Sequence, residues 1–154
     1  MPKGPIRRAQ LIAPFGVGAM VVVRDGTSLI TAGIDHWYKR EDGNEAEDKL
    51  EFRVDEWRLA RSLGVNHFQE PPDFRKSNRG DGVLNSYLTV PFLRFPQWHF
   101  CSSCNRLEKC TLTKRDKAKC PECESNNKTK YMAQVPIVAM CERAHIQDFP
   151  WREW

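Results

Sequence analysis

The sequence predicts a small α+β protein made of β-hairpins, one or two short helices and a ribbon closed by four cysteines. Three observations support this fold class: an Asp-Gly turn between two apolar runs, a short one-sided apolar stretch that ends at a glycine, and two pairs of closely spaced cysteines. With 154 residues and thinly spread Leu, Ile, Val and Phe, we expect small lobes rather than one large core.

Residues 19–32 predict a β-hairpin. Asp25-Gly26 is a two-residue turn signal, with valines at 21–23 before it and Leu29-Ile30 after it.

Residues 55–63 predict a helix. Asp55 is a candidate N-cap, and Gly64 is placed to end the helix. The apolar side chains form a partly one-sided stripe: Trp57, Leu59, Ala60 and Leu63. We therefore expect Trp57 to pack against the protein rather than to contact a ligand. Residues 87–100 follow as an aromatic stretch interrupted by prolines, which favours an edge strand.

Cys101, Cys104, Cys120 and Cys123 carry the strongest chemical signal. They form two C-x2-C pairs separated by fifteen residues, and each pair can turn both sulfurs toward one point. The spacing predicts Zn²⁺ in a closed four-thiolate shell, hence a zinc ribbon. Such a site is structural because it leaves no open position for a substrate. Two disulfides, buried reduced cysteines and an iron–sulfur cluster are the alternatives.

Basic residues gather between the cysteine pairs. Residues 101–130 contain eight Lys and Arg against four Asp and Glu, a surplus equal to the whole chain's net charge of +4. Five of them are candidates for phosphate contacts that read no bases: Lys109, Lys114, Arg115, Lys117 and Lys119. A solvated protein surface is an equally good interpretation.

The chain is expected to divide into an N-terminal α+β region, residues 1–90, and a zinc-ribbon region, residues 91–154. The second region ends in the aromatic residues Phe149, Trp151 and Trp154, which predict a segment that docks on a partner. No apolar run reaches the ~18 residues of a membrane span, and the N-terminus lacks the apolar core of a secretory signal. We therefore expect a cytoplasmic protein without membrane contact.

Four blocks of the sequence resemble the N-terminal region of the DrmB-type subunit of DISARM anti-phage defence systems. They are Arg8-x-Gln10-Leu11-Ile12-x-x-Phe15-Gly16-x-Gly18-Ala19, Leu63-Gly64-Val65 before Phe68-x-x-Pro71-Pro72, Arg94-Phe95-Pro96-x-Trp98, and Cys141-x-x-x-His145-Ile146-x-Asp148-Phe149-Pro150-Trp151. Ala144 departs from the family pattern, which usually has glycine before the histidine, and family members are several-fold longer.

The resemblance implies an accessory subunit that supports DNA engagement by a helicase-like partner. The remaining part of a DrmB-like protein is a further expected partner. The alternative is a zinc-stabilised protein–protein adaptor without nucleic-acid contact.

We expect no enzyme, because the histidines and the remaining cysteines show no recognised catalytic spacing. Cys141 and His145 are two potential metal ligands, which do not make a closed site. A second zinc site completed by Cys110, His99 or cysteines of a longer chain stays open. Packing, with a hydrogen bond from His145 to Asp148, is the preferred interpretation.

Overall fold

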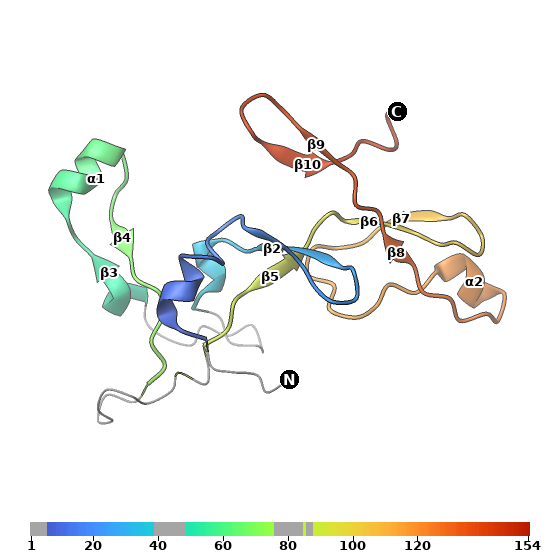
Figure 1. Cartoon of the computed structure of the whole chain (residues 1–154), viewed down its shortest axis with the longest axis horizontal. Coiled ribbons are helices and arrows are strands. Elements are labelled where there is room, and N and C mark those ends of the chain that lie inside the picture. The colour runs from blue at the N-terminus through green and yellow to red at the C-terminus, as the bar shows by residue number, and fades with distance from the viewer. Residues whose placement is uncertain (1–5, 39–48, 76–84, 86–87) are drawn as a thin grey trace. The chain divides into compact units, whose positions relative to one another are not determined.

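The protein is described from a computed structural model that covers residues 6–38, 49–75, 85 and 88–154. The chain forms two compact units, residues 1–19 with 31–91 and residues 20–30 with 92–154 (Figure 1). The predicted α+β class is confirmed, because short antiparallel sheets accompany two α-helices and a cluster of four cysteines. In the part of the chain that the structure describes, the helices are too short and too polar to span a lipid bilayer.

The first unit contains short elements around a small aromatic core. Its elements are the 3-10 helices η1 (Arg8–Leu11), η2 (Ile34–His36) and η3 (Lys49–Phe52), the strands β3 (Arg53–Val54) and β4 (Phe68–Gln69), and the helix α1 (Trp57–Leu63). The buried core residues are Leu11, Trp37, Tyr38, Phe52 and Leu88. The rings of Tyr38 and Phe52 stack with centroids 5.7 Å apart, and the Tyr38 hydroxyl donates to the carbonyl oxygen of Glu70 at 2.5 Å.

Helix α1 ends where the sequence predicts but begins differently. Gly64 has a φ of 67°, a left-handed conformation that favours glycine, and its N–H donates to the carbonyl oxygen of Ala60. The N-cap is Glu56 rather than Asp55, because the Asp55 carboxylate binds Arg53 at 2.6 Å. The packing predicted for Trp57 is wrong: Ala60 is the one buried residue of the helix, and Trp57 is 69% exposed beneath the guanidinium of Arg58.

The second unit is built from three small antiparallel sheets and one short helix. Its elements are β1 (Met20–Val22), β2 (Ser28–Thr31), β5 (Phe92–Arg94), β6 (Trp98–Phe100), β7 (Leu107–Lys109), α2 (Pro121–Ser125), β8 (Ala133–Gln134), β9 (Val138–Met140) and β10 (Ile146–Asp148). The sheet orders are β1-β2-β5, β7-β6-β8 and β9-β10. The segment 87–100, predicted to be one edge strand, therefore contains two strands. β6 is the central strand of its sheet. It can pair on both sides because the prolines of this segment come before β6 and leave the N–H groups of β6 available.

The predicted hairpin is confirmed, with a longer turn. Met20 pairs with Ile30 and Val22 with Ser28. Val23 donates its N–H to the carbonyl oxygen of Thr27, so the loop has three residues, ending at Gly26 with a φ of 83°. The hairpin was predicted to belong to the N-terminal region, whereas the contacts of residues 20–30 group it with residues 92–154, because β2 neighbours β5 in the sheet.

Gln134 joins three segments of the second unit. Its side-chain oxygen accepts from the Ser28 N–H at 2.6 Å, and its amide nitrogen donates to the carbonyl oxygens of Ser28, at 3.1 Å, and Pro96, at 2.6 Å. This half-buried side chain thus ties β8 to β2 and to the connection between β5 and β6.

Candidate metal centre

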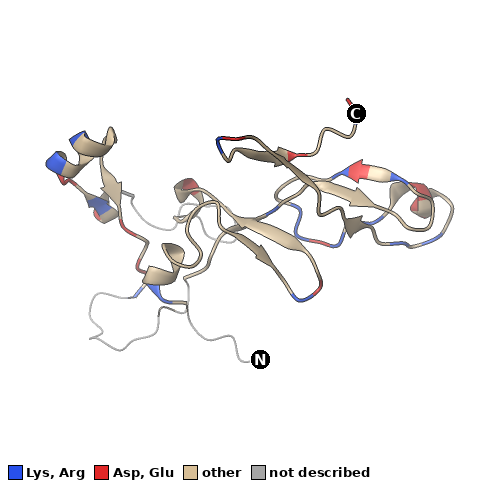
Figure 2. Cartoon of the chain, turned by 45° about the horizontal axis from the view of Figure 1, so that its top comes forward, with Lys and Arg blue, Asp and Glu red and all other residues tan. Residues whose placement is uncertain are grey.

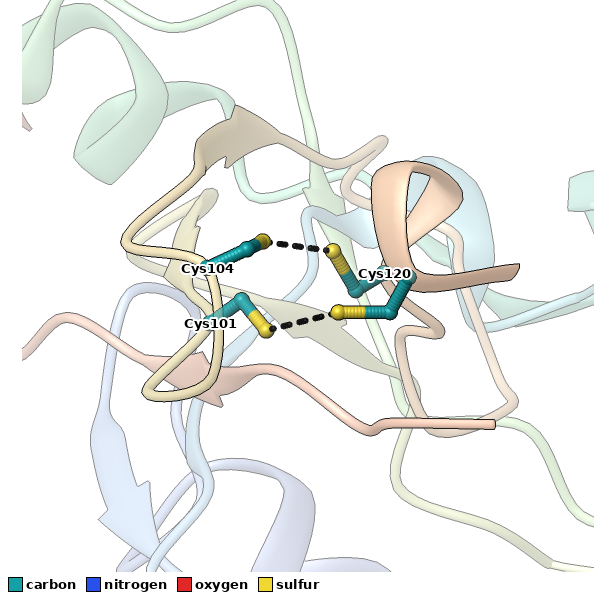
Figure 3. A group of neighbouring side chains, drawn as sticks. Cys101, Cys104 and Cys120 are labelled. Carbon is teal, nitrogen blue, oxygen red and sulfur yellow. Dashed lines mark hydrogen bonds between the residues drawn. The ribbon is translucent and has the colours of Figure 1, made fainter. Parts of the chain in front are cut away.

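The first cysteine pair lies in the turn between β6 and β7. Cys101 directly follows β6, and its N–H donates to the carbonyl oxygen of Arg106 at 2.9 Å. Its own carbonyl oxygen accepts from Asn105, which has a left-handed φ of 60°. The tight turn points the side chains of Cys101 and Cys104 toward Cys120 (Figure 3).

The second pair lies at the beginning and in the middle of α2. Cys120 is the N-cap residue, and Pro121 occupies the first helical position, where its fixed φ suits a helix start. The N–H of Cys120 donates to Lys130 at 2.8 Å, which pairs the segment before α2 with the segment after it. Three residues later, Cys123 lies on the same face of the helix.

The four sulfur atoms form one group. Their ligand atoms all lie within 4.8 Å of one another, with 3.8 Å between Cys101 and Cys123 and 3.4 Å between Cys104 and Cys120. Sulfurs at tetrahedral corners around Zn²⁺ would be about 3.8 Å apart, given Zn–S bonds of about 2.3 Å. None of the four cysteines forms a disulfide in this structure, and the geometry fits a four-thiolate metal site.

Burial and charge also suit a metal ion at this position. Cys101, Cys120 and Cys123 are at most 4% exposed, whereas Cys104 lies at the surface. Backbone N–H groups of Ser103 and Cys104 lower the pKa of Cys101 to about 6, whereas burial raises the pKa of Cys123 to about 12. Four thiolates in one place repel one another, and a bound cation would compensate that charge.

His99 and Cys110 lie near the cluster but outside the set of ligands. His99 is 1% exposed, its Nδ1 donates to the carbonyl oxygen of Gln97 at 2.8 Å, and its Nε2 lies 3.5 Å from Nη1 of Arg94. Burial lowers the pKa of His99, which therefore stays neutral at pH 7. Cys110 packs against the buried cysteine core. Neither residue joins Cys141 and His145 in a second group of three or more ligands among the described residues.

The basic loop, defined as residues 110–119, joins β7 to α2. Lys114, Arg115, Lys117 and Lys119 are exposed on it. Figure 2 shows the Lys and Arg positions along the chain in blue. Lys109 lies on β7 instead and makes an ion pair of 3.3 Å with Asp148. The structure thus brings four of the five predicted phosphate-contacting residues onto one loop and gives the fifth an acidic partner.

Arg94 is a further basic residue beside this loop, a position that the sequence did not predict for it. Its N–H donates to Leu112 at 2.8 Å and its Nη2 donates to the carbonyl oxygen of Arg115 at 3.3 Å. Its Nε is buried without a hydrogen-bond partner among the described residues. The signal in the sequence is weak, because Arg94 precedes the cysteines by seven positions and reaches the basic loop only in the folded protein, through its bonds to Leu112 and Arg115.

The C-terminal aromatic residues pack on one another. The ring centroids of Phe149 and Trp151 are 4.6 Å apart, and Trp154 meets both in edge-to-face contacts of 6.1 and 6.3 Å. Trp154 is nevertheless 88% exposed. The structure therefore brings the three predicted docking residues together and leaves one of them open to solvent.

His145 does not form the predicted bond with Asp148. The Asp148 carboxylate accepts from the backbone N–H of Gln97 at 2.8 Å and pairs with Lys109. The Nδ1 of His145 lies 3.4 Å from the sulfur of Cys141.

Comparison with known proteins relates the chain to a domain family and to a defence protein. A family model described as a domain of unknown function (DUF8724) matches residues 7–154. The chain is also 34% identical over 73 residues to the DISARM protein DrmB of Bacillus paralicheniformis, a match that covers 42% of this chain. That match spans 12% of the length of the relative. The predicted resemblance to DrmB is confirmed by this similarity.

Proposed function

Because the chain belongs to the DUF8724 family and resembles part of a DrmB protein, we propose that it is a zinc-binding accessory subunit of a DISARM-type anti-phage defence complex. In this role it supports DNA engagement by a helicase-like partner in the cytoplasm. The rest of a DrmB-like protein is the second proposed partner, since the match covers 12% of the relative.

Zinc is the proposed occupant of the four-cysteine cluster. Four thiolates favour Zn²⁺ over harder cations, and their separations match its tetrahedral shell. Bound there, the ion would hold the turn after β6 against the start of α2 and supply part of this lobe's folding energy. A closed shell offers no open position, so we propose a structural centre and no catalysis by this chain.

The DNA-binding part of the proposal rests on how the basic loop is held in the structure. The loop begins at β7, which pairs with β6, and ends at the ligand Cys120. Arg94 binds its middle through Leu112 and Arg115. A loop fixed at both ends and in the middle presents its lysines as one set, which suits contacts to successive phosphates without base reading.

Charge reversal of Lys114 and Lys117 tests this role. If each lysine contacts one phosphate of a DNA duplex, the double variant Lys114→Glu/Lys117→Glu lowers the slope of log K against log salt by about 1.8. The matched control reverses Arg58 and Arg61 of α1, which changes the net charge equally. Fluorescence anisotropy at several salt concentrations measures the DNA affinity of the two double variants. Equal slopes for both would show that the basic loop does not contact DNA.

A zinc-stabilised adaptor without DNA contact is the second candidate, and the exposed Trp154 favours it. Aromatic residues dominate many interfaces, so Trp154→Ala is expected to weaken capture of a DrmB-like or helicase-like partner by about 2 kcal/mol. Co-purification with products of neighbouring genes measures this loss. Trp57→Ala is the matched control, since Trp57 is also largely exposed. If Trp154→Ala captures the partner as well as the wild-type protein does, Trp154 is not a docking residue.

A further inference from the structure

The loop between β9 and β10 presents a cysteine and a histidine as a chelating pair. Cys141 donates its N–H to the carbonyl oxygen of His145 at 3.1 Å, and Ala144 donates to the carbonyl oxygen of Cys141 at 2.9 Å with a left-handed φ of 61°. These bonds fix a five-residue loop in which both ligand side chains face each other. Figure 1 shows the loop at the free end of the hairpin, away from β6 and β8 of the same unit.

The separation of the two ligand atoms fits one tetrahedral metal ion. The Cys141 sulfur lies 3.4 Å from Nδ1 of His145. A sulfur and an imidazole nitrogen that bind the same Zn²⁺ at about 2.3 and 2.0 Å are about 3.5 Å apart. Both residues are exposed, so they are accessible to an ion and to further ligands from another chain.

Two ligands leave the shell half complete, and the described part of this chain supplies no others. Its only group of three or more potential ligands is the four-cysteine cluster. A second copy of the pair would complete a Cys2His2 set, in which two thiolates and two neutral imidazoles balance the charge of Zn²⁺.

The surface around the pair favours a second copy as the source of those ligands. Met140 and Ile146 are paired across the strands next to the ligands and are 68% and 42% exposed, so two hairpin ends in contact would cover them. Glu142 and Arg143 lie in the loop and make no ion pair with any described residue. A two-fold axis can place Glu142 against Arg143 of the copy, so the loop is self-complementary in charge.

We propose that Cys141 and His145 form half of a second Zn²⁺ site, completed by the same two residues of a second copy of this chain. The second site joins two chains through the ends of their β9–β10 hairpins. It is separate from the four-cysteine cluster, which each chain completes alone.

The test titrates zinc into the full chain and measures mass by light scattering and metal by elemental analysis. The expected result is a monomer with about one zinc per chain at low metal, then a dimer with about 1.5 per chain in excess zinc. Cys141→Ser and His145→Ala should each stay monomeric with about one zinc per chain. His145→Cys should restore the dimer because thiolate replaces imidazole as ligand. His67→Ala, which changes an exposed histidine outside the hairpin, should dimerise normally.

Several results would overturn the proposal. A mass that stays monomeric at all zinc concentrations excludes the shared site, as does a dimer that persists in both Cys141→Ser and His145→Ala. A monomer that binds a full second zinc equivalent through this pair would mean that the remaining ligands come from elsewhere than a second copy. Retention of one zinc in each variant shows that the fold and the first site are intact, so loss of the dimer reports on the hairpin alone.

Discussion

Replacement of Cys120 by Ser is expected to release the metal and to unfold the lobe around α2. Cys120 is completely buried, and its sulfur lies 3.4 Å from that of Cys104. A serine hydroxyl at this position is a poor ligand for zinc, because it is not ionised at neutral pH. The three remaining thiols would be left with an incomplete shell.

The expected magnitude follows from how little else holds this lobe together. Its buried core has five residues, of which three are the ligands Cys101, Cys120 and Cys123; only Ala118 and Met132 are not ligands. Burial of a methionine side chain contributes about 1.5–3 kcal/mol. Structural zinc binding contributes about 10–16 kcal/mol at neutral pH, which equals or exceeds the whole stability of an ordinary domain. Loss of the ion should therefore unfold the lobe at 25 °C rather than merely lower its melting temperature.

The assay is zinc content per chain together with amide proton exchange over residues 98–134, on protein purified without chelator. Wild-type protein should carry about one zinc at stoichiometric metal, with slow exchange in β6 and β8, and Cys120→Ser should show neither. The control is Cys141→Ser, the same chemical change at an exposed cysteine outside the cluster, which should retain both. Stoichiometric zinc and unchanged protection in Cys120→Ser would refute the reasoning.

Two further perturbations test the units separately. A hydrogen bond from Arg75 holds the pKa of Asp73 below its usual value of 3.8, so the carboxylate stabilises the fold at neutral pH and this contribution is lost as pH falls through the lowered pKa. Asp73→Asn should lower the free energy of unfolding by about 1 kcal/mol at pH 7, and by progressively less as the pH falls below 3.8, in urea titrations; a difference independent of pH would contradict this. Gln134→Ala should cost about 2–3 kcal/mol in the second unit, because three hydrogen bonds are lost and the Ser28 N–H and the Pro96 carbonyl oxygen lose their partner, whereas the Ser28 carbonyl oxygen keeps the Phe95 N–H at 3.4 Å. A loss under 1 kcal/mol in the same titration, with Gln147→Ala as the exposed control, would show that water replaces these bonds.

Local sequence signals predicted the features that depend on a few neighbouring residues. The two C-x2-C pairs form tight turns by themselves, and the fifteen residues between them are enough to bring the pairs together. Gly64 ends α1 because only the residues of its own turn decide a left-handed C-cap. The hairpin at residues 20–31 is equally local. The third residue of its loop, however, follows only from the hydrogen-bond register of the structure.

Predictions failed where long-range contacts decide the outcome. The stripe on α1 indicated that Trp57 would be buried, but Ala60 is the one residue of that helix that is buried. Asp148 was assigned to His145, three residues away, whereas it binds Gln97 and Lys109 from distant parts of the sequence. The role of Gln134 could not be inferred either, because its partners lie 38 and 106 positions away.

The metal centre and the basic loop are coupled through geometry, although their charges oppose each other. Residues 101–130 have a surplus of four basic residues when the thiols are neutral, and four thiolates with one Zn²⁺ reduce that net charge to +2. If net charge alone governed DNA contact, metal-free protein would bind DNA more tightly than the zinc form. The loop, however, ends at Cys120 and is bound to β5 through Arg94, so folding of the lobe holds the loop backbone in place. Ordered contacts avoid the conformational entropy that an unfolded segment loses on binding, about 1–2 kcal/mol per backbone residue. Four ordered residues outweigh the loss of two charges, each worth about 1 kcal/mol at an exposed site, so the proposed function requires the zinc form to be the stronger DNA binder.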